Sequence, residues 1–281
     1  GIYQGWSNAS NYFAGNVGIG TTIATNAVSI GNTAKLAAGI VTAHNVFANR
    51  YHGDTNNNFY AGPFSGSGAA GISSGATSNI AIGHSTGSNI TSGGNNVLLG
   101  KCSGIKQTTA FSNVLLGSCV GRDLTTGGTN IGIGRLALDG VITGTYNVAI
   151  GYRAGRSQYS ASLGVPDATQ NIAIGFDAGD TAIQGGQNQN IFLGFKAGDG
   201  LVQGSSTSTA CTNNNDNILI GSNTGDQSYV CGLYCRNVLI GDRAGNSSIG
   251  VGDGCDYVNN VLLGTLAGKG YAGTCNIFIG A

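Results

Sequence analysis

The sequence predicts an all-β fold, a repetitive β-solenoid of about twelve short coils, and two observations carry that prediction. A five-residue phrase recurs twelve times between Asn58 and Gly280: an asparagine, an aliphatic residue, any residue, an aliphatic residue and a glycine. The composition also disfavours helices, because the chain has 51 Gly and no Met, and all its acidic residues are Asp. A repeat of this length cannot bury an apolar face alone, so successive copies must stack into a column.

The spacing of the phrase separates a constant coil from variable loops. Four successive intervals between starting asparagines are 17 residues, and the others run from 16 to 27. A constant minimum with a variable excess indicates one coil plus insertions. The phrase begins at Asn58, Asn79, Asn96, Asn113, Asn130, Asn147, Asn171, Asn190, Asn217, Asn237, Asn260 and Asn276.

The chain divides into two parts on this pattern. Residues 1–57 carry alternating apolar positions without the full repeat, so we expect an N-terminal extended, capping or assembly segment there. Residues 58–281 form the β-solenoid repeat domain. Solenoid ends expose unpaired backbone groups and are usually blocked, so the N-terminal segment of one molecule could cover the far end of another.

Within each coil, side chains alternate along the strand, so the first and third residues after the asparagine share a face. We expect that face, which holds Val97 and Leu99 in one coil, to fill the interior. The middle residue then faces outward, yet it too is apolar, and a strand that is apolar on both faces is normally covered on both. The predicted assembly face consists of Leu98, Leu115, Phe192, Leu219, Leu239, Leu262 and Phe278.

An outward apolar row of this length favours a homo-oligomer. Three copies around an axis are the simplest arrangement, and a filament is possible; a covering loop from the same chain is the alternative.

We assign structural roles to the two invariant parts of the phrase. The asparagine is expected at a corner, where its amide bonds the backbone of its own or the next coil, and the glycine permits a positive φ or a close backbone approach.

The repeat from Asn147 to Gly155 resembles the head repeats of trimeric autotransporter adhesins and, more closely, the repeat arrays of bacteriophage tail fibres. The stretches Gly15–Thr22 and Ala34–Ala43 are similar to the segment upstream of such arrays in tail fibres that end in a self-cleaving chaperone domain. The resemblance implies a trimeric β-roll or β-helical shaft and attachment of a virion. The coil is longer than the adhesin repeat, and the 7 Cys depart from the adhesin pattern.

The cysteines indicate an oxidising, extracellular setting. Two candidate disulfides would join Cys211 to Cys231 and Cys235 to Cys255. The first pair falls six residues before a strand asparagine in adjacent coils, within the usual reach of a disulfide, while a zinc site involving three of these four cysteines is a rival interpretation. Cys102 and Cys119 occupy equivalent positions one coil apart, as either stacked thiols or a bridge.

Loops that project from solenoids often carry recognition. Extra residues follow Gly155, Gly198 and Gly245, and loops in this part of the chain contain tyrosines, whose flat rings and hydroxyls suit a cell-surface glycan or a protein receptor; packing is the alternative. The candidate binding residues are Tyr159, Tyr229, Tyr234 and Tyr257.

No catalytic, cofactor-binding or metal-binding set emerges from the sequence. The formal net charge of +0 offers no basic stripe for nucleic acid, and no apolar stretch approaches the roughly 20 residues of a membrane-spanning helix. Asp177 and Asp180 are candidates on spacing for the paired carboxylates of glycoside hydrolysis, although aspartates in repeats more often form turns.

We therefore expect a non-enzymatic fibre protein, located outside the cell or on a virion surface. It would be a phage tail fibre or adhesin-like shaft that mediates attachment. The alternative is a self-polymerising structural filament or sheath protein assembled head to tail.

Overall fold

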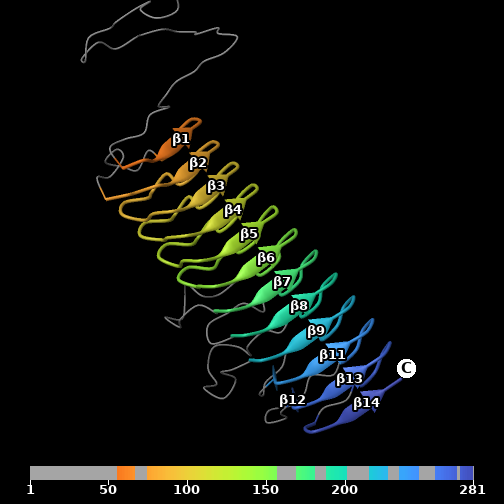
Figure 1. Cartoon of the computed structure of the whole chain (residues 1–281). Helices are drawn as coiled ribbons and strands as arrows, with labels where there is room; N and C mark the ends of the chain where they lie inside the picture. Colours follow the sequence, from red (N-terminus) through yellow and green to blue (C-terminus); the bar gives the residue numbers. More distant parts are fainter. Residues whose placement is uncertain are drawn as a thin grey trace, which may run out of the picture. The chain divides into compact units, whose positions relative to one another are not determined.

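The structure is a computed structural model that describes residues 56–66, 75–156, 169–180, 188–200, 215–226, 234–246, 257–270 and 273–280. Within these ranges the chain contains strands and turns and no helix. Successive coils stack along one direction, each contributing a strand to the same side (Figure 1). The predicted β-solenoid is confirmed. Residues 1–55 of the predicted N-terminal segment lie outside the described ranges.

The strands are two or three residues long. They are β1 (Phe59–Ala61), β2 (Ile80–Ile82), β3 (Val97–Leu99), β4 (Val114–Leu116), β5 (Ile131–Ile133), β6 (Val148–Ile150), β7 (Ile172–Ile174), β8 (Ile191–Leu193), β9 (Ile218–Ile220), β10 (Tyr234–Cys235), β11 (Val238–Ile240), β12 (Tyr257–Val258), β13 (Val261–Leu263) and β14 (Ile277–Ile279). Twelve of them form one parallel sheet in the order of the sequence, and β10 and β12 form a separate pair. Every pairing is in register, so Leu98 of β3 lies beside Leu115 of β4.

The backbone turns sharply at both ends of each strand, which limits the strand to three residues. Asn95, two residues before β3, has a φ of 59°, in the left-handed region. Gly83, directly after β2, has a φ of 136°. A Cβ on Gly83 would lie 2.7 Å from the carbonyl oxygen of Gly100 in the next coil. The glycine is therefore required both for its conformation and for the close approach of the next coil.

The asparagines that begin the strands form a continuous ladder inside the column. The Oδ1 of Asn96 accepts hydrogen bonds from the backbone N–H of Asn113 at 3.0 Å and from its Nδ2 at 3.1 Å. The Nδ2 of Asn96 also donates to the carbonyl oxygen of Ala110 at 2.9 Å, within its own coil. The same two hydrogen bonds, from the backbone N–H and the Nδ2 of one asparagine to the Oδ1 of the asparagine before it, join every successive pair from Asn58 to Asn276. The predicted corner role of the asparagine is confirmed.

Insertions do not interrupt this ladder. Asn190 and Asn217 are 27 residues apart, yet the Nδ2 of Asn217 donates to the Oδ1 of Asn190 at 2.9 Å. The pair Asn113 and Asn130, 17 residues apart, makes the same bond at 3.0 Å. The extra residues therefore leave the column between the ladder positions and return to it in register.

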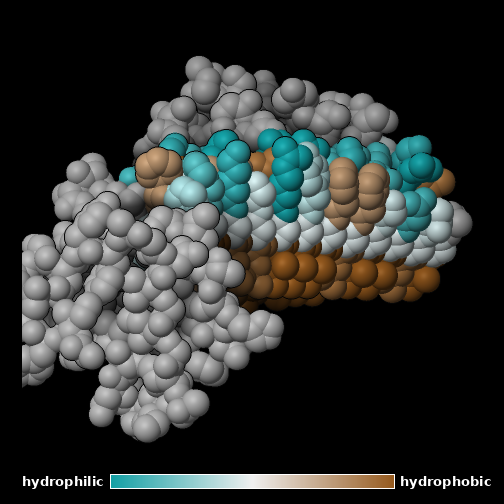
Figure 2. Space-filling model, turned by 90° about the horizontal axis from the view of Figure 1, so that it is seen from above, coloured by the Kyte–Doolittle hydropathy of each residue, from teal (hydrophilic) through white to brown (hydrophobic). Residues whose placement is uncertain are grey.

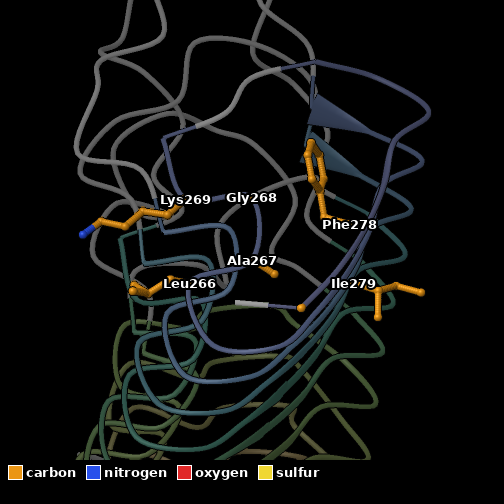
Figure 3. A pocket seen from close by; sticks show the side chains of 7 residues that line it. Leu266, Ala267, Gly268, Lys269, Phe278 and Ile279 are labelled. Atoms are coloured by element: carbon orange, nitrogen blue, oxygen red, sulfur yellow. The ribbon is translucent and has the colours of Figure 1, made fainter.

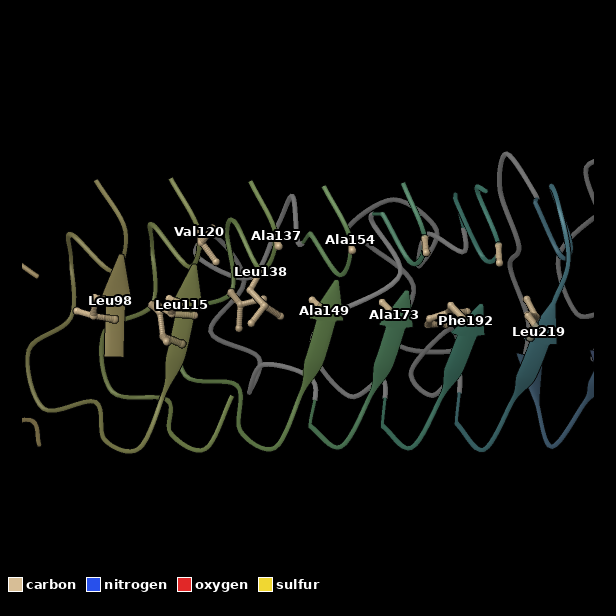
Figure 4. Close-up of a cluster of buried hydrophobic side chains, with 14 of the residues drawn as sticks. Leu98, Leu115, Val120, Ala137, Leu138, Ala149, Ala154, Ala173, Phe192 and Leu219 are labelled. Atoms are coloured by element: carbon tan, nitrogen blue, oxygen red, sulfur yellow. The ribbon is translucent and has the colours of Figure 1, made fainter. Parts of the chain in front are cut away.

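The middle residue of each strand points into the column, so the predicted orientation of the strands is wrong. The proposed assembly residues Leu98, Leu115, Phe192, Leu219, Leu239 and Leu262 are buried, and Phe278 is partly buried against the same core. Figure 4 shows several of these side chains in one row inside the coils. Alternation along a strand fixes which residues share a face, but it does not decide which face is interior. The interior is narrow and accepts one side chain from each strand.

Side chains from the opposite wall complete the core and compensate for the size of the strand residue. Gly132 is the middle residue of β5, and a Cβ there would lie 2.6 Å from Cγ1 of Val120 and 3.2 Å from Cδ1 of Leu138. Both of these larger residues are buried. One buried side chain is polar and unsatisfied: the side-chain amide of Gln107 makes no hydrogen bond among the described residues. Interior packing is therefore a joint property of neighbouring coils.

Replacement of Asn113 by Ala tests the ladder. The substitution leaves the N–H and Nδ2 of Asn130 without their acceptor, and it removes the Nδ2 donor from the Oδ1 of Asn96 and from the carbonyl oxygen of Gly127. Since each buried polar group left unpaired costs about 1–3 kcal/mol, we expect a loss of at least about 3 kcal/mol of unfolding free energy, measured by denaturant unfolding. Gln107→Leu is the control, since it removes a buried amide that has no partner, and it should leave stability unchanged or raise it. Equal destabilisation by the two variants would refute a stabilising ladder.

Candidate functional site

The first and third residues of the strands form an apolar surface on the outside of the column, which we call the outer face. Its first row consists of Ile80, Val97, Val114, Ile131, Val148, Ile172, Ile191, Ile218, Val238, Val261 and Ile277. Its second row consists of Ile82, Leu99, Leu116, Ile133, Ile150, Ile174, Leu193, Ile220, Ile240, Leu263 and Ile279. Figure 2 shows this surface as a continuous brown band along the column.

The outer face is accessible to solvent along its length. Its residues are exposed or half-buried, with Ile80, Ile131 and Ile240 at 42%, 39% and 40% exposure. Its eleven strands each occupy about 4.8 Å of the column and together cover about 53 Å, and three residues are about 10 Å wide, so the flat area of the face is about 530 Å². That area is at the upper end of the apolar patches found on monomeric proteins, about 300–600 Å². The outward apolar surface is thus formed by the first and third residues of the strands, and not by the middle residues that were predicted to form it.

Two rows of residues border the outer face. The Asn-side rim contains the exposed residue directly before each ladder asparagine: Ser78, Asn95, Ser112, Thr129, Tyr146, Gln170, Gln189, Asp216, Arg236, Asn259 and Cys275. The Gly-side rim contains the residue directly after each strand's glycine: His84, Lys101, Ser118, Arg135, Tyr152, Phe176, Phe195, Ser222, Asp242 and Thr265. Both rims are thus largely polar and flank an apolar centre, as in protein–protein interfaces.

Three aromatic residues interrupt the polar character of the Gly-side rim. The rings of Tyr152 and Phe176 stack with centroids 5.1 Å apart, and those of Phe176 and Phe195 stack at 5.4 Å. The guanidinium of Arg135 lies 5.7 Å from the centroid of the Tyr152 ring. Because the rings stack on one another, they present mainly their edges to solvent, and Phe176 and Phe195 are still 45% and 48% exposed.

The two carboxylates considered for glycoside hydrolysis are each engaged by an arginine. Asp177 accepts hydrogen bonds from Nε and Nη2 of Arg153, both at 2.7 Å. Asp180 accepts from Nε and Nη2 of Arg156 at 2.7 and 3.1 Å. Both pairs join neighbouring coils, and paired, bidentate geometry of this kind fixes position. In this arrangement the two aspartates brace the column rather than face an open cleft.

Two further carboxylates, those of Asp199 and Asp226, lie in the next two coils. Burial raises the pKa of Asp199 to about 6, and the negative charge of Asp180 adds to this effect while Lys196 opposes it. The amine of Lys196 lies 3.4 Å from the carboxylate of Asp199. Burial also raises the pKa of Asp226, against the attraction of Lys196. These groups therefore make the stability of this section dependent on pH.

The other predicted site residues are placed only in part. Tyr159, Tyr229, Cys211, Cys231 and Cys255 lie outside the described residues. Tyr234 and Tyr257 pair in register between β10 and β12, and their side chains are not described. Cys235 is buried in β10. The candidate disulfides and the tyrosine binding site thus remain predictions.

Cys102 and Cys119 lie at the same corner of adjacent coils. Their backbone N–H groups donate to His84 and Lys101 respectively, each at 2.9 Å. Both are partly buried thiols without a disulfide. Of the two possibilities left open by the sequence, the structure contains the stacked thiols.

No group of three or more histidine, cysteine or acidic side chains suited to a metal ion occurs in the described part of the chain. A hollow of about 300 Å³ lies at the last described coil and is lined by Leu266, Ala267, Gly268, Lys269, Phe278, Ile279 and Gly280 (Figure 3). Phe278, the last of the middle strand residues that line the core, forms part of its wall. The outer face is therefore the more extensive candidate for a functional surface.

Comparison of the chain with protein-family models, with curated proteins and with solved structures finds no match. The described residues include no helix of the length and apolarity that would cross a membrane.

The raised pKa of Asp199 predicts that this protein loses stability as the pH rises. The folded state holds the proton more tightly than the unfolded chain, because burial lifts the pKa from 3.8 to about 6. Stability contributed by this group is therefore present below pH 4 and is lost between about pH 4 and 6. We expect Asp199→Asn to raise the melting temperature at pH 7 and to weaken its dependence on pH.

Asp123→Asn is the matched control for this prediction. Burial raises the pKa of Asp123, but the hydrogen bond from Lys106 and the charge of Arg122 outweigh it, so the pKa is lowered overall. Its replacement should reduce the melting temperature at pH 7. If both substitutions shifted the melting temperature in the same direction, the assignment of the Asp199 effect to its protonation would be wrong.

Proposed function

We propose that this protein is a structural shaft that assembles with copies of itself through the outer face and serves as an attachment fibre outside the cell or on a virion. The observation that carries the proposal is the accessible apolar face that runs along eleven consecutive strands of the sheet, β2 to β14. A parallel sheet that is apolar on both sides is normally covered on both sides. Here one side fills the coil interior, and the other has no cover among the described residues.

A second copy of the chain suits this surface better than a smaller ligand. The face is long and nearly uniform in its Val, Ile and Leu content. Three such faces turned toward a common axis would remove their aliphatic side chains from water while leaving the rims and loops outside. Burial of apolar surface contributes about 25 cal/mol per Å², so a shared axis would strongly favour association.

The construction of the column fits a load-bearing shaft. The asparagine ladder and the axial backbone hydrogen bonds at the corners tie each coil to the next. The resemblance of the repeats to tail-fibre and adhesin arrays supports attachment as the purpose of such a shaft. Several copies side by side would present several equal binding sites, and multivalency turns weak contacts into firm attachment.

Two lysines placed on the outer face test the assembly. Ile131→Lys and Ile133→Lys together put charges on β5, where both side chains point outward. We expect the variant to keep its β-sheet circular dichroism and to sediment as a 28.1 kDa monomer, whereas the unmodified chain sediments as a trimer.

The control carries two lysines at exposed positions outside the sheet, Thr126→Lys and Thr143→Lys. This variant should assemble like the unmodified protein. The proposal fails if the outer-face variant keeps the same mass as the unmodified protein. A concentration-dependent filament in place of a trimer would favour the sheath-like alternative.

A further inference from the structure

Two oppositely charged side chains, one on each rim, lie beside the same strand. Arg236 on the Asn-side rim is exposed, and Asp242 on the Gly-side rim is half-buried. They flank the same strand, β11, and neither makes an ion pair among the described residues. Arg153 and Asp177, by contrast, are paired within the chain. The rim residues Lys101, Arg135 and Asp216 also make no ion pair among the described residues, but none of them has an opposite charge beside the same strand on the other rim. Arg236 and Asp242 are thus opposite charges at one height on opposite rims.

The exposed aromatic residues on the rims show a similar correspondence. Tyr146 on the Asn-side rim is 60% exposed, and Tyr152 flanks the same strand on the Gly-side rim. Phe176 and Phe195, also exposed, share their coils with Gln170 and Gln189 on the Asn-side rim. Aromatic rim residues therefore cluster beside three consecutive strands, β6 to β8.

Symmetry decides which rims meet when copies assemble. Any rotation about an axis parallel to the column, with the outer faces turned toward that axis, brings the Asn-side rim of one copy against the Gly-side rim of the next. If the copies are level, Arg236 of one meets Asp242 of the next, and Tyr146 meets Tyr152. A shift of one coil in one direction sets Asp216 against Asp242, both acidic, and a shift in the other sets Arg236 against Ser222.

The rims also bring the contact to a size that supports stable association. The outer face alone offers about 530 Å², whereas a standard interface buries about 800 Å² on each partner. One further residue of width on each side raises the available area to about 900 Å². Contact across the rims is therefore needed for an interface of ordinary size.

We propose that the partner of the two rims is a second copy of this chain, parallel and level with the first, and that Arg236 and Asp242 pair across the rims and select this register. The inference rests on the proposed function, because it requires the outer face to be the contact between copies. Like charges placed opposite each other disfavour wrong registers more strongly than a single exposed pair stabilises the right one.

A charge-exchange experiment tests the pairing. Arg236→Glu and Asp242→Arg each place like charges together, and sedimentation at low salt should show dissociation at a protein concentration at least about tenfold lower for the unmodified chain than for either variant. The double variant restores opposite charges and should assemble like the unmodified protein. The differences should shrink at 1 M salt, where the screening length falls to about 3 Å.

Arg243→Glu is the matched control, since Arg243 is exposed, adjacent to Asp242 and not part of a rim. It should assemble normally. If the single variants behave like this control, or if the double variant does not recover, the rim pairing is wrong while the proposed function stands. An antiparallel dimer would give that result, because it sets each rim against its own kind. If the unmodified chain is monomeric, both the proposed function and the pairing fail.

Discussion

Each coil is tied to the next by an asparagine whose Oδ1 takes two hydrogen bonds from the asparagine that follows, and this link sets the position of the other side chains. It holds neighbouring coils in register even where 27 residues separate two asparagines. Because the register is fixed, each position of the repeat becomes a row along the column. The interior row, the two rows of the outer face and both rims all follow from that one constraint.

The sequence was sufficient for the fold because its period is set by this axial link. The recurrence of Asn and Gly around three residues predicts short parallel strands with a sharp turn at each end, and the structure confirms them. The interior and exterior of the strand could not be decided in the same way, since a run such as Val97, Leu98 and Leu99 is apolar at every position. Alternation alone allows either face of the strand to be the interior one.

A signal for the correct orientation was nevertheless present. The middle position varies widely in size, from Gly132 and Ala149 to Phe192, as expected where neighbouring coils share a confined space. The first and third positions are almost uniformly Val, Ile or Leu, as expected on a flat surface. The rims and ion pairs were less predictable. Arg153 pairs with Asp177 across 24 residues, and the insertions make the number of residues between equivalent positions of neighbouring coils variable.

Some charged side chains are paired within the chain, whereas others at the borders of the outer face make no ion pair among the described residues. Arg153 and Arg156 are fixed by aspartates of the neighbouring coil, and the interior row is buried from Ala81 to Leu262. The outer face, by contrast, displays aliphatic side chains to solvent, and Arg236 and Asp242 stand at its two borders without ion pairs among the described residues. The proposed attachment shaft of several chains would account for both features.

Sedimentation equilibrium of the unmodified chain over a wide concentration range tests whether the outer face joins copies of the chain. We expect a mass that is a fixed multiple of 28.1 kDa, with three copies favoured. A single mass of 28.1 kDa at every concentration would contradict it, because the outer face would then be stable in water without a second copy.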